Sequence, residues 1–239
     1  MDPPFDDRPP PMPDAGDALG YRTQLAGEGV VLLAERALFW PLAQTLLVAD
    51  VHLGKAATFR AGGIPIPRGA TASDLARLTG LLARSGARRL VVLGDFLHAA
   101  AGRVTALDAA FVAWRAQHAS LAITLVRGNH DTHAGDPPPA WGIEVVAEPH
   151  LAAPFLLCHT PAQPPTGYAL CGHVHPGVWV GSPVGFDRAR LPCFVLGGKR
   201  ALLPAFGRLT GLALVTPQAD ERIVAIAGSR LFALPPRHL

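Results

Sequence analysis

The stretch LAITLVRGNHD, residues 121–131, places an apolar run directly before an asparagine, a histidine and an aspartate. An apolar run of this length, rich in β-branched residues, is typical of a buried β-strand. Side chains that carry an amide, an imidazole and a carboxylate gain little from packing at the end of such a strand. The stretch therefore predicts a strand that delivers Asn129, His130 and Asp131 to a functional site.

Two other stretches end in the same way. TLLVADVH, residues 45–52, carries Asp50 and His52 after an apolar run, and RRLVVLGD, residues 88–95, ends on Asp95. In an open α/β sheet, ligands bind at the carboxyl ends of the strands. We therefore expect all three strand ends to meet at one site.

The segments between these runs have helical spacing. Ser73 is the expected N-cap of one helix and Gly86 its end, and Thr105 is expected to begin a second helix. The apolar positions of the two helices are Leu75, Leu78, Leu81, Leu82, Leu107, Phe111, Val112 and Trp114. Strands that alternate with helices predict parallel crossovers, with helices covering the sheet.

From about residue 142 the pattern changes to short apolar strands separated by glycine and proline. This half of the chain predicts a mostly antiparallel second sheet that packs on the first. Its strands also end in polar residues, because PFLLCH ends on His159 and YALCGHVH contains His173 and His175. The prediction is an α/β fold in which several strand ends converge.

Length and composition are consistent with one globular domain. The chain has 239 residues, of which 49% are hydrophobic and 16% charged, with a net charge of +3. Residues 1–20 are rich in proline and aspartate and predict a flexible tail, so we expect one domain over residues 21–239, without a cap domain. We find no secretory signal and no membrane span, and we expect a cytoplasmic protein that does not bind membranes.

The three cysteines, Cys158, Cys171 and Cys193, lie inside apolar runs. An odd number of cysteines argues against a framework of disulfides, so we expect reduced, buried thiols. Cys158 and His159 should face opposite sides of their strand, which leaves the histidine free to face the site.

The polar residues are chemically suited to bind metal ions. In extended chain, residues two apart point the same way, so Asp50 with His52, and His173 with His175, can each face one site. Carboxylate, imidazole and amide ligands suit Mn²⁺, Fe or Zn²⁺, and we expect Mn²⁺ first. Seven candidate ligands exceed the needs of one tetrahedral ion, which favours two ions that share a bridging carboxylate. Two neighbouring ions are a known device for phosphoester hydrolysis, because they clamp phosphate oxygens and lower the pKa of a water.

The ordered motifs DVH, GD, GNHD, H and GHVH resemble those of the calcineurin-like metallophosphoesterases. Within that superfamily, LVVLGDFLHA and LCGHVHPGV are similar to the ligase-associated DNA damage response endonuclease group (PdeM), over residues 30 to about 215. The resemblance implies a four-layer α/β/β/α sandwich of two mixed β-sheets flanked by helices. It also implies two metal sites, one formed by Asp50, His52, Asp95 and His175, and the other by Asp95, Asn129, His159 and His173.

Protonation of the leaving group requires an acid that is not itself a metal ligand. His130 lies between Asn129 and Asp131 and is placed for that role, and the resemblance implies the same one. We expect His130 and Asp131 as the catalytic residues.

Lys55, Arg60 and Arg68 lie in a segment punctuated by glycine and proline, residues 53–72, just after the first ligand pair. A cationic loop at that place could bind substrate phosphates, with His98 at its edge. The alternative is an ordinary solvated loop.

These features together predict a metal-dependent phosphodiesterase that acts on DNA in repair. The resemblance adds a DNA ligase, a helicase and an exonuclease as partners. One alternative is an enzyme with the same site and a small substrate, such as a nucleotide or a cyclic nucleotide. Another is a metal-stabilised accessory subunit of a repair complex, in which an unligated acid such as His130 would have no use.

Overall fold

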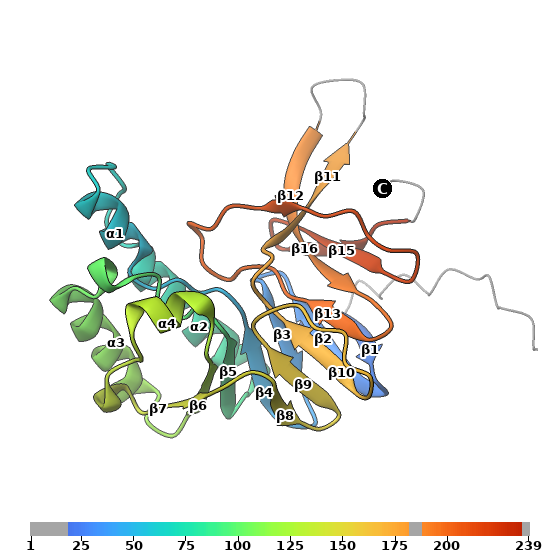
Figure 1. Cartoon of the computed structure of the whole chain (residues 1–239), viewed down its shortest axis with the longest axis horizontal. Helices are drawn as coiled ribbons and strands as arrows, with labels where there is room; N and C mark the ends of the chain where they lie inside the picture. Colours follow the sequence, from blue (N-terminus) through green and yellow to red (C-terminus); the bar gives the residue numbers. More distant parts are fainter. Residues whose placement is uncertain (1–18, 182–187, 236–239) are drawn as a thin grey trace, which may run out of the picture.

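The computed structural model describes residues 19–181 and 188–235. The first sheet has seven strands in the order β1-β2-β3-β4-β5-β6-β7 (Figure 1). The strands are β1 (Tyr21–Leu25), β2 (Glu28–Leu33), β3 (Ala37–Trp40), β4 (Thr45–Val48), β5 (Arg89–Leu93), β6 (Ala122–Val126) and β7 (Ile143–Val146). β1 to β4 pair antiparallel and β4 to β7 pair parallel. The carboxyl ends of β4, β5 and β6 therefore lie at one edge of the sheet, as the sequence predicts.

β7 lies in the first sheet, which differs from the prediction. The short apolar stretches after residue 142 were all expected in the second sheet, but β7 pairs in parallel with β6, with Ile123 opposite Ile143. Local hydrophobicity identifies a strand but does not specify the partner with which it hydrogen-bonds.

The second sheet contains nine strands, with β14-β11-β12-β13-β10-β9-β8 as its main order and β15 and β16 attached to β12. They are β8 (His150–Ala152), β9 (Phe155–Cys158), β10 (Tyr168–Cys171), β11 (Pro176–Gly181), β12 (Arg188–Leu196), β13 (Arg200–Leu202), β14 (Ala213–Leu214), β15 (Arg222–Ala227) and β16 (Arg230–Ala233). β9, β10 and β13 are mutually parallel, whereas β12 pairs antiparallel with β11, β13 and β15.

Alternation along the strands divides the interior into two cores on either side of the first sheet. On one face, residues such as Leu47, Val91 and Val126 pack against Phe155 and Phe194 of the second sheet. This face-to-face packing holds the two sheets together. The three cysteines are free and buried, and they lie in a third cluster on the outer side of the second sheet, as expected for core thiols.

The other face of the first sheet is covered by the helices α2 (Ala70–Ser85), α3 (Thr105–Gln117) and α4 (Asn129–Ala134), whereas α1 (Lys55–Ala61) projects away from the sheet (Figure 1). Leu78 of α2 and Phe111 of α3 belong to that core. The fold is therefore an α/β arrangement of two mixed sheets flanked by helices. In residues 142–181 and 188–235 there is no helix, so the fourth, helical layer implied by the resemblance is not seen there.

Two local expectations differ from the structure. The segment after His52 contains α1 instead of a loop, because KAATFRA consists mostly of residues that tolerate a helix. Gly54 and Gly62 flank this helix as its N-cap and C-cap. α2 begins at Ala70, after Gly69 in the left-handed region, so Ser73 lies inside the helix and does not cap it. α3 begins at Thr105 as predicted, although Val112 is 43% exposed.

Residues 1–18 of the expected tail lie outside the described residues. No helix in the described part of the chain is long and apolar enough to cross a membrane.

Candidate metal centre

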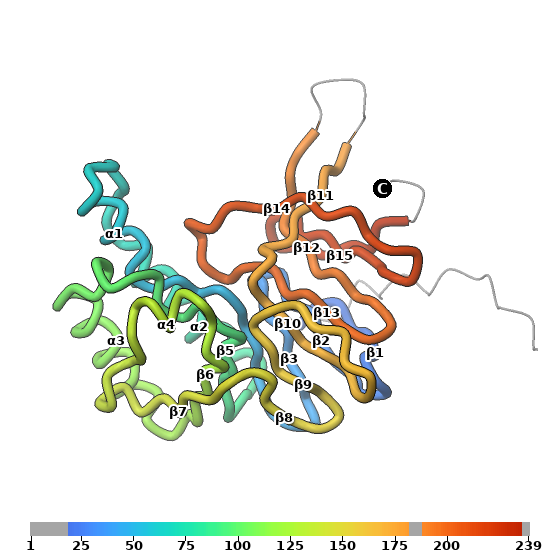
Figure 2. Tube along the Cα trace, in the orientation of Figure 1, coloured from blue at the N-terminus to red at the C-terminus, as the bar shows by residue number. Residues whose placement is uncertain are grey.

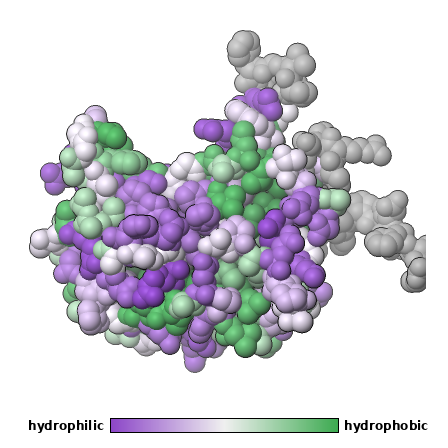
Figure 3. All heavy atoms as spheres, in the orientation of Figure 1, coloured by the Kyte–Doolittle hydropathy of each residue, from purple (hydrophilic) through white to green (hydrophobic). Residues whose placement is uncertain are grey.

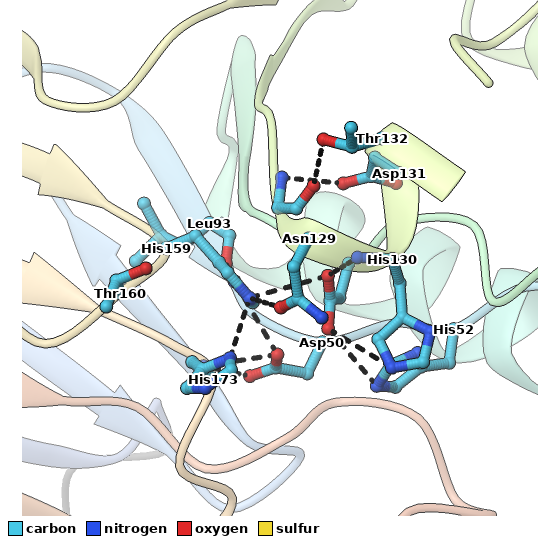
Figure 4. A network of polar contacts seen from close by, with 12 residues as sticks. Asp50, His52, Leu93, Asn129, His130, Asp131, Thr132, His159, Thr160 and His173 are labelled. Atoms are coloured by element: carbon cyan, nitrogen blue, oxygen red, sulfur yellow. Dashed lines mark hydrogen bonds and ion pairs between the residues drawn. The ribbon is translucent and has the colours of Figure 1, made fainter. Parts of the chain in front are cut away.

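The candidate ligands lie where five strands end, on the loops that follow β4, β5, β6, β9 and β10 (Figure 4). Each strand brings one or two of them, and the set is Asp50, His52, Asp95, Asn129, His159, His173 and His175. The first sheet and the second sheet both contribute, so the site lies between the two sheets at their common end.

The backbone of the site is strained. Five candidate ligands have positive φ angles, and they are Asp50 (53°), His52 (51°), Asp95 (51°), His173 (71°) and His175 (53°). Residues with a side chain rarely adopt this region, because each costs about 1–3 kcal/mol and persists only where the surroundings enforce it. Here backbone hydrogen bonds enforce it. The N–H of Asp50 donates to the backbone carbonyl of Gly94 at 3.1 Å, and the N–H of His52 donates to the backbone carbonyl of Asp95 at 2.8 Å.

These angles correct the reasoning from extended chain. Asp50 and His52 do share one group, but they reach it from a left-handed turn beyond the end of β4. His173 and His175 do not share a group: His173 joins Asp95 and His159, whereas His175 joins Asp50 and His52.

Two glycines permit the close approach of these loops. A Cβ on Gly94 would lie 2.1 Å from His159 Nδ1, and a Cβ on Gly128 would lie 2.4 Å from Asp95 Oδ1. Neither distance is compatible with a side chain, so glycine is required at both positions.

Asp50, His52 and His175 form the first ligand group, with one ligand atom from each within 4.8 Å of the others. His175 Nε2 lies 3.4 Å from Asp50 Oδ1. Burial, and then the charge of Lys55, lowers the pKa of His52 to about 2, so its imidazole is neutral at pH 7. The Nε2 atoms of both histidines are buried and have no hydrogen-bond partner among the described residues. Two orphaned imidazole nitrogens beside a buried carboxylate fit a divalent cation.

Asp95, His159 and His173 form the second ligand group, and Asn129 adjoins it. His159 Nδ1 lies 3.1 Å from the carbonyl of Leu93, which can only accept, so this nitrogen carries the proton. His159 Nε2 then presents a lone pair, 2.9 Å from Asn129 Oδ1, 3.0 Å from His173 Nδ1 and 3.4 Å from Asp95 Oδ1 (Figure 4). Acceptor atoms that converge in this way are suited to a cation, and a backbone carbonyl behind a histidine is a usual partner of a metal ligand.

His130 stands beside His52 of the first group, with ring centroids 4.8 Å apart, but remains accessible. Its side chain is 38% exposed, and its Nε2 lies 4.0 Å from Asp95 Oδ2. Its Nδ1 donates to the carbonyl of His98 at 2.7 Å, which orients the ring with Nε2 toward the site. This geometry suits a group that exchanges a proton with a substrate.

Asp131 is not in a position to do so, and the expectation of a catalytic role is corrected. Its side chain is fully buried, and its two oxygens accept the backbone N–H groups of Leu97 and Gly128, both at 2.9 Å. Asp131 therefore holds the start of α4 against the loop after β5, and it acts by positioning its neighbours.

Comparison with solved structures identifies a close relative of this arrangement. The crystal structure of Pseudomonas putida nuclease MPE matches 90% of this chain and 99% of that chain, with 42% identity and a TM-score of 0.78. The chain belongs to the metallophosphoesterase family.

A second match, to Yfce, a phosphoesterase from E. coli, covers 80% of this chain and 97% of that chain, with 17% identity. Its TM-score of 0.37 is too low to indicate a shared fold. No model of a protein family matches the chain, and a search of curated proteins gives no match. Family membership and the two ligand groups together make the protein a metal-dependent hydrolase of phosphoester bonds.

The residues expected to bind substrate lie at different distances from the metallophosphoesterase centre. Lys55 is half-buried at the start of α1. Burial lowers the pKa of its amine, and the charges of Asp95 and Asp50 partly oppose this shift, so the amine lies near these two ligands. Arg60 and Arg68 are exposed, and Arg60 donates to the carbonyl of Ile66 at 3.3 Å.

His98 lies behind the first ligand group. Its Nδ1 is 3.3 Å from His52 Nδ1, and its ring stacks on that of His130 with centroids 4.9 Å apart. It therefore contacts two residues of the centre directly, and substrate binding by His98 stays a prediction.

Sequence reasoning missed Glu148 of the metallophosphoesterase. Its carboxylate accepts the N–H groups of His159 and Thr160 at 2.7 and 2.8 Å, and the Thr160 hydroxyl at 2.9 Å. These bonds set the turn that carries His159. The signal was present, since Glu148 closely follows the apolar run of β7, as the ligands follow theirs.

Proposed function

We propose that this metallophosphoesterase binds two divalent ions, Mn²⁺ in the first place, and cleaves phosphodiesters within DNA strands. The observation that carries the proposal is the placing of Asp95 between the two ligand groups. Its Oδ1 lies 3.4 Å from His159 Nε2, and its Oδ2 lies 3.8 Å from His52 Nε2. One carboxylate with an oxygen toward each group is the expected bridge of a dinuclear site.

In this proposal Asp50, His52 and His175 hold one ion, Asn129, His159 and His173 hold the other, and Asp95 is shared. Bound ions would neutralise charge on the phosphate and lower the pKa of a water. The chain supplies the geometry, because strained loops and backbone hydrogen bonds hold the ligand atoms in place before any substrate arrives.

His130 would donate the proton that the leaving oxygen needs. The support is its exposed Nε2 next to Asp95, together with the carbonyl of His98 behind its Nδ1. That carbonyl accepts the Nδ1 proton, and it keeps the ring pointing into the site.

DNA is favoured as the substrate for three reasons. The similar protein MPE is described as a nuclease, which is an enzyme that cleaves nucleic acid. α1 follows the ligand His52 and the β11–β12 hairpin follows the ligand His175, and an open hollow lies between these two elements (Figure 3). Lys55 and Arg60 border that hollow and can bind backbone phosphates. A role in DNA repair, beside a ligase, a helicase and an exonuclease, is part of the proposal on the resemblance alone.

A closed circle of single-stranded DNA tests the proposal, because it offers no ends to an exonuclease or a monoesterase. Protein loaded with Mn²⁺ is expected to linearise the circle and then to fragment it, and the same protein in EDTA is expected to leave it closed. Protein that leaves the circle intact while it rapidly hydrolyses a small nucleotide or a cyclic nucleotide would overturn the DNA assignment in favour of the small-substrate alternative.

A further inference from the structure

The β11–β12 hairpin projects from the body of the molecule beside the centre (Figure 1). β11 begins at Pro176, immediately after the candidate ligand His175, and runs outward to Gly181. β12 returns from Arg188. The hairpin is thus attached directly to a loop that carries a candidate ligand.

The two faces of the hairpin differ in chemistry. Val178 is buried and Val180 packs on the third cluster, so this face of β11 belongs to the core. The other face carries Trp179, which pairs with Arg190 across the ladder, and Gly181, which pairs with Arg188. Residues that lie opposite in an antiparallel pair share a face. Trp179, Arg188 and Arg190 therefore form one outward surface, which we call the Trp179 face.

Trp179 is unusual among the four tryptophans of the chain. It is 37% exposed, whereas Trp40, Trp114 and Trp141 are 8%, 5% and 2% exposed. The guanidinium carbons of Arg188 and Arg190 lie 4.7 and 5.9 Å from the centroid of its ring. Among the described residues, neither arginine forms an ion pair with a carboxylate, so the face is positively charged.

The Trp179 face continues toward the centre. β14 pairs with β11 at its base, where Leu214 lies opposite Gly177, and Leu214 is 51% exposed (Figure 2). Figure 3 shows hydrophobic side chains gathered at the base of the hairpin, next to the hollow. Trp179 is four residues beyond His175, or about 13 Å along an extended strand. A single strand bound to Trp179 would therefore reach the centre within a few nucleotides.

We propose that the Trp179 face is a stacking arm for single-stranded nucleic acid, in which the Trp179 indole stacks on an unpaired base and Arg188 and Arg190 bind the flanking phosphates. The inference rests on the proposed function and extends it, because it names the residues that bind the strand beside the centre. Aromatic rings with adjacent arginines are the usual means of binding single strands without sequence preference. In a duplex the bases are already stacked and paired, so Trp179 would find no free ring face.

A protein partner is the competing occupant, since exposed tryptophan and arginine are also common at protein interfaces. Charge and position favour nucleic acid, because the arginines on the face have no described carboxylate beside them and the strand that carries Trp179 starts at the candidate ligand His175. A face that binds a protein would leave DNA cleavage unchanged when Trp179 is replaced, so the test separates the two occupants.

The first measurement follows the binding of labelled oligothymidylate to the full chain loaded with Mn²⁺, mixed rapidly so that the signal precedes cleavage. Trp179→Ala should weaken binding by about ten-fold or more, the size expected for one base–aromatic stack, whereas Trp179→Phe should retain most of the affinity. The matched control is Leu151→Ala, which removes another exposed apolar side chain, on β8, and should bind as the parent does. Oligothymidylate should quench the tryptophan fluorescence of the parent but not that of Trp179→Phe, because the other tryptophans are buried.

The second measurement maps cleavage of a linear single strand that contains one abasic nucleotide. The parent should show a gap in its cleavage ladder at a fixed distance of a few nucleotides from the abasic position, and Trp179→Ala should show no gap. Equal binding and equal ladders for parent and Trp179→Ala would overturn the stacking arm, even if the closed circle is cut. Trp179-dependent binding without cleavage of the circle would overturn the proposed function and leave the stacking arm standing.

Discussion

His130 combines a side chain that is 38% exposed with a backbone carbonyl behind its Nδ1. Because it donates protons in the proposed reaction and holds no ion, His130→Gln should retain both ions while turnover falls by about 10²–10⁴. The loss should be much smaller with a p-nitrophenyl ester, whose leaving group scarcely needs a proton. Turnover on both substrates and the metal content of each variant test this.

Two further variants serve as a negative and a positive control for the His130→Gln measurement. His133→Gln places the same substitution one turn along α4, on an exposed histidine that contacts the carbonyl of Asn129, and it should leave turnover within about two-fold. Asp95→Asn should lose most of the bound metal together with the activity. If His130→Gln loses metal as Asp95→Asn does, His130 is a ligand and the assignment of the acid is wrong.

At the scale of elements, α1 forms the wall of the hollow opposite the hairpin (Figure 3). It presents Lys55 toward the ligands and Arg60 toward solvent. If both side chains bind DNA phosphates, the affinity of the parent should fall with salt more steeply than that of the Lys55→Ala, Arg60→Ala double variant. The difference in the slope of log K against log salt should be about 1.4, at about 0.7 per contact with a single strand.

The matched control removes two arginines at a distance from the hollow. Arg222→Ala with Arg230→Ala takes the same net charge from β15 and β16, where both side chains are exposed. This variant should keep the slope of the parent. Equal slopes for the α1 variant and the parent would show that the α1 cations are solvated and do not bind substrate.

At the scale of the whole molecule, the centre joins the two sheets. Asp50 and Asp95 come from the first sheet, while His159, His173 and His175 come from the second. The polypeptide already links the sheets here, since His173 N–H donates to Asp50 Oδ2 at 2.9 Å. Ions held by ligands from both sheets would tie them more strongly, and they would bind the folded chain only.

Metal binding should therefore raise the melting temperature. Mn²⁺ at about 100 times its dissociation constant would add about 2.7 kcal/mol, and in a chain of this size that corresponds to a rise of about 5–11 °C. Scanning calorimetry of the chain with EDTA and with Mn²⁺ measures the difference, and Asp95→Asn should abolish most of it. An equal melting temperature in EDTA and Mn²⁺ would show that the two sheets are not linked through metal.

Local sequence determined most strands, the two longer helices α2 and α3, and the chemistry of the centre. The apolar runs that end at Val48, Leu93 and Val126 are short-range signals, since burial of a strand depends on the residues within it. The metal-binding residue types directly after these runs could be recognised without a structure, because little else explains polar atoms there. Glu148 carries the same signal and could have been found by the same rule.

Tertiary structure decided how those residues are grouped. His173 and His175 separate into different groups because both lie in the left-handed region, which hydrogen bonds from distant loops enforce. Asp131 acts as a positioning residue because its carboxylate accepts the backbone N–H of Leu97, which lies 34 positions earlier in the chain. β7 joined the first sheet because strand pairing depends on neighbours in space. The local sequence specifies which side chains follow the end of a strand. Contacts between segments that are far apart in the chain determine the direction in which each of these side chains points.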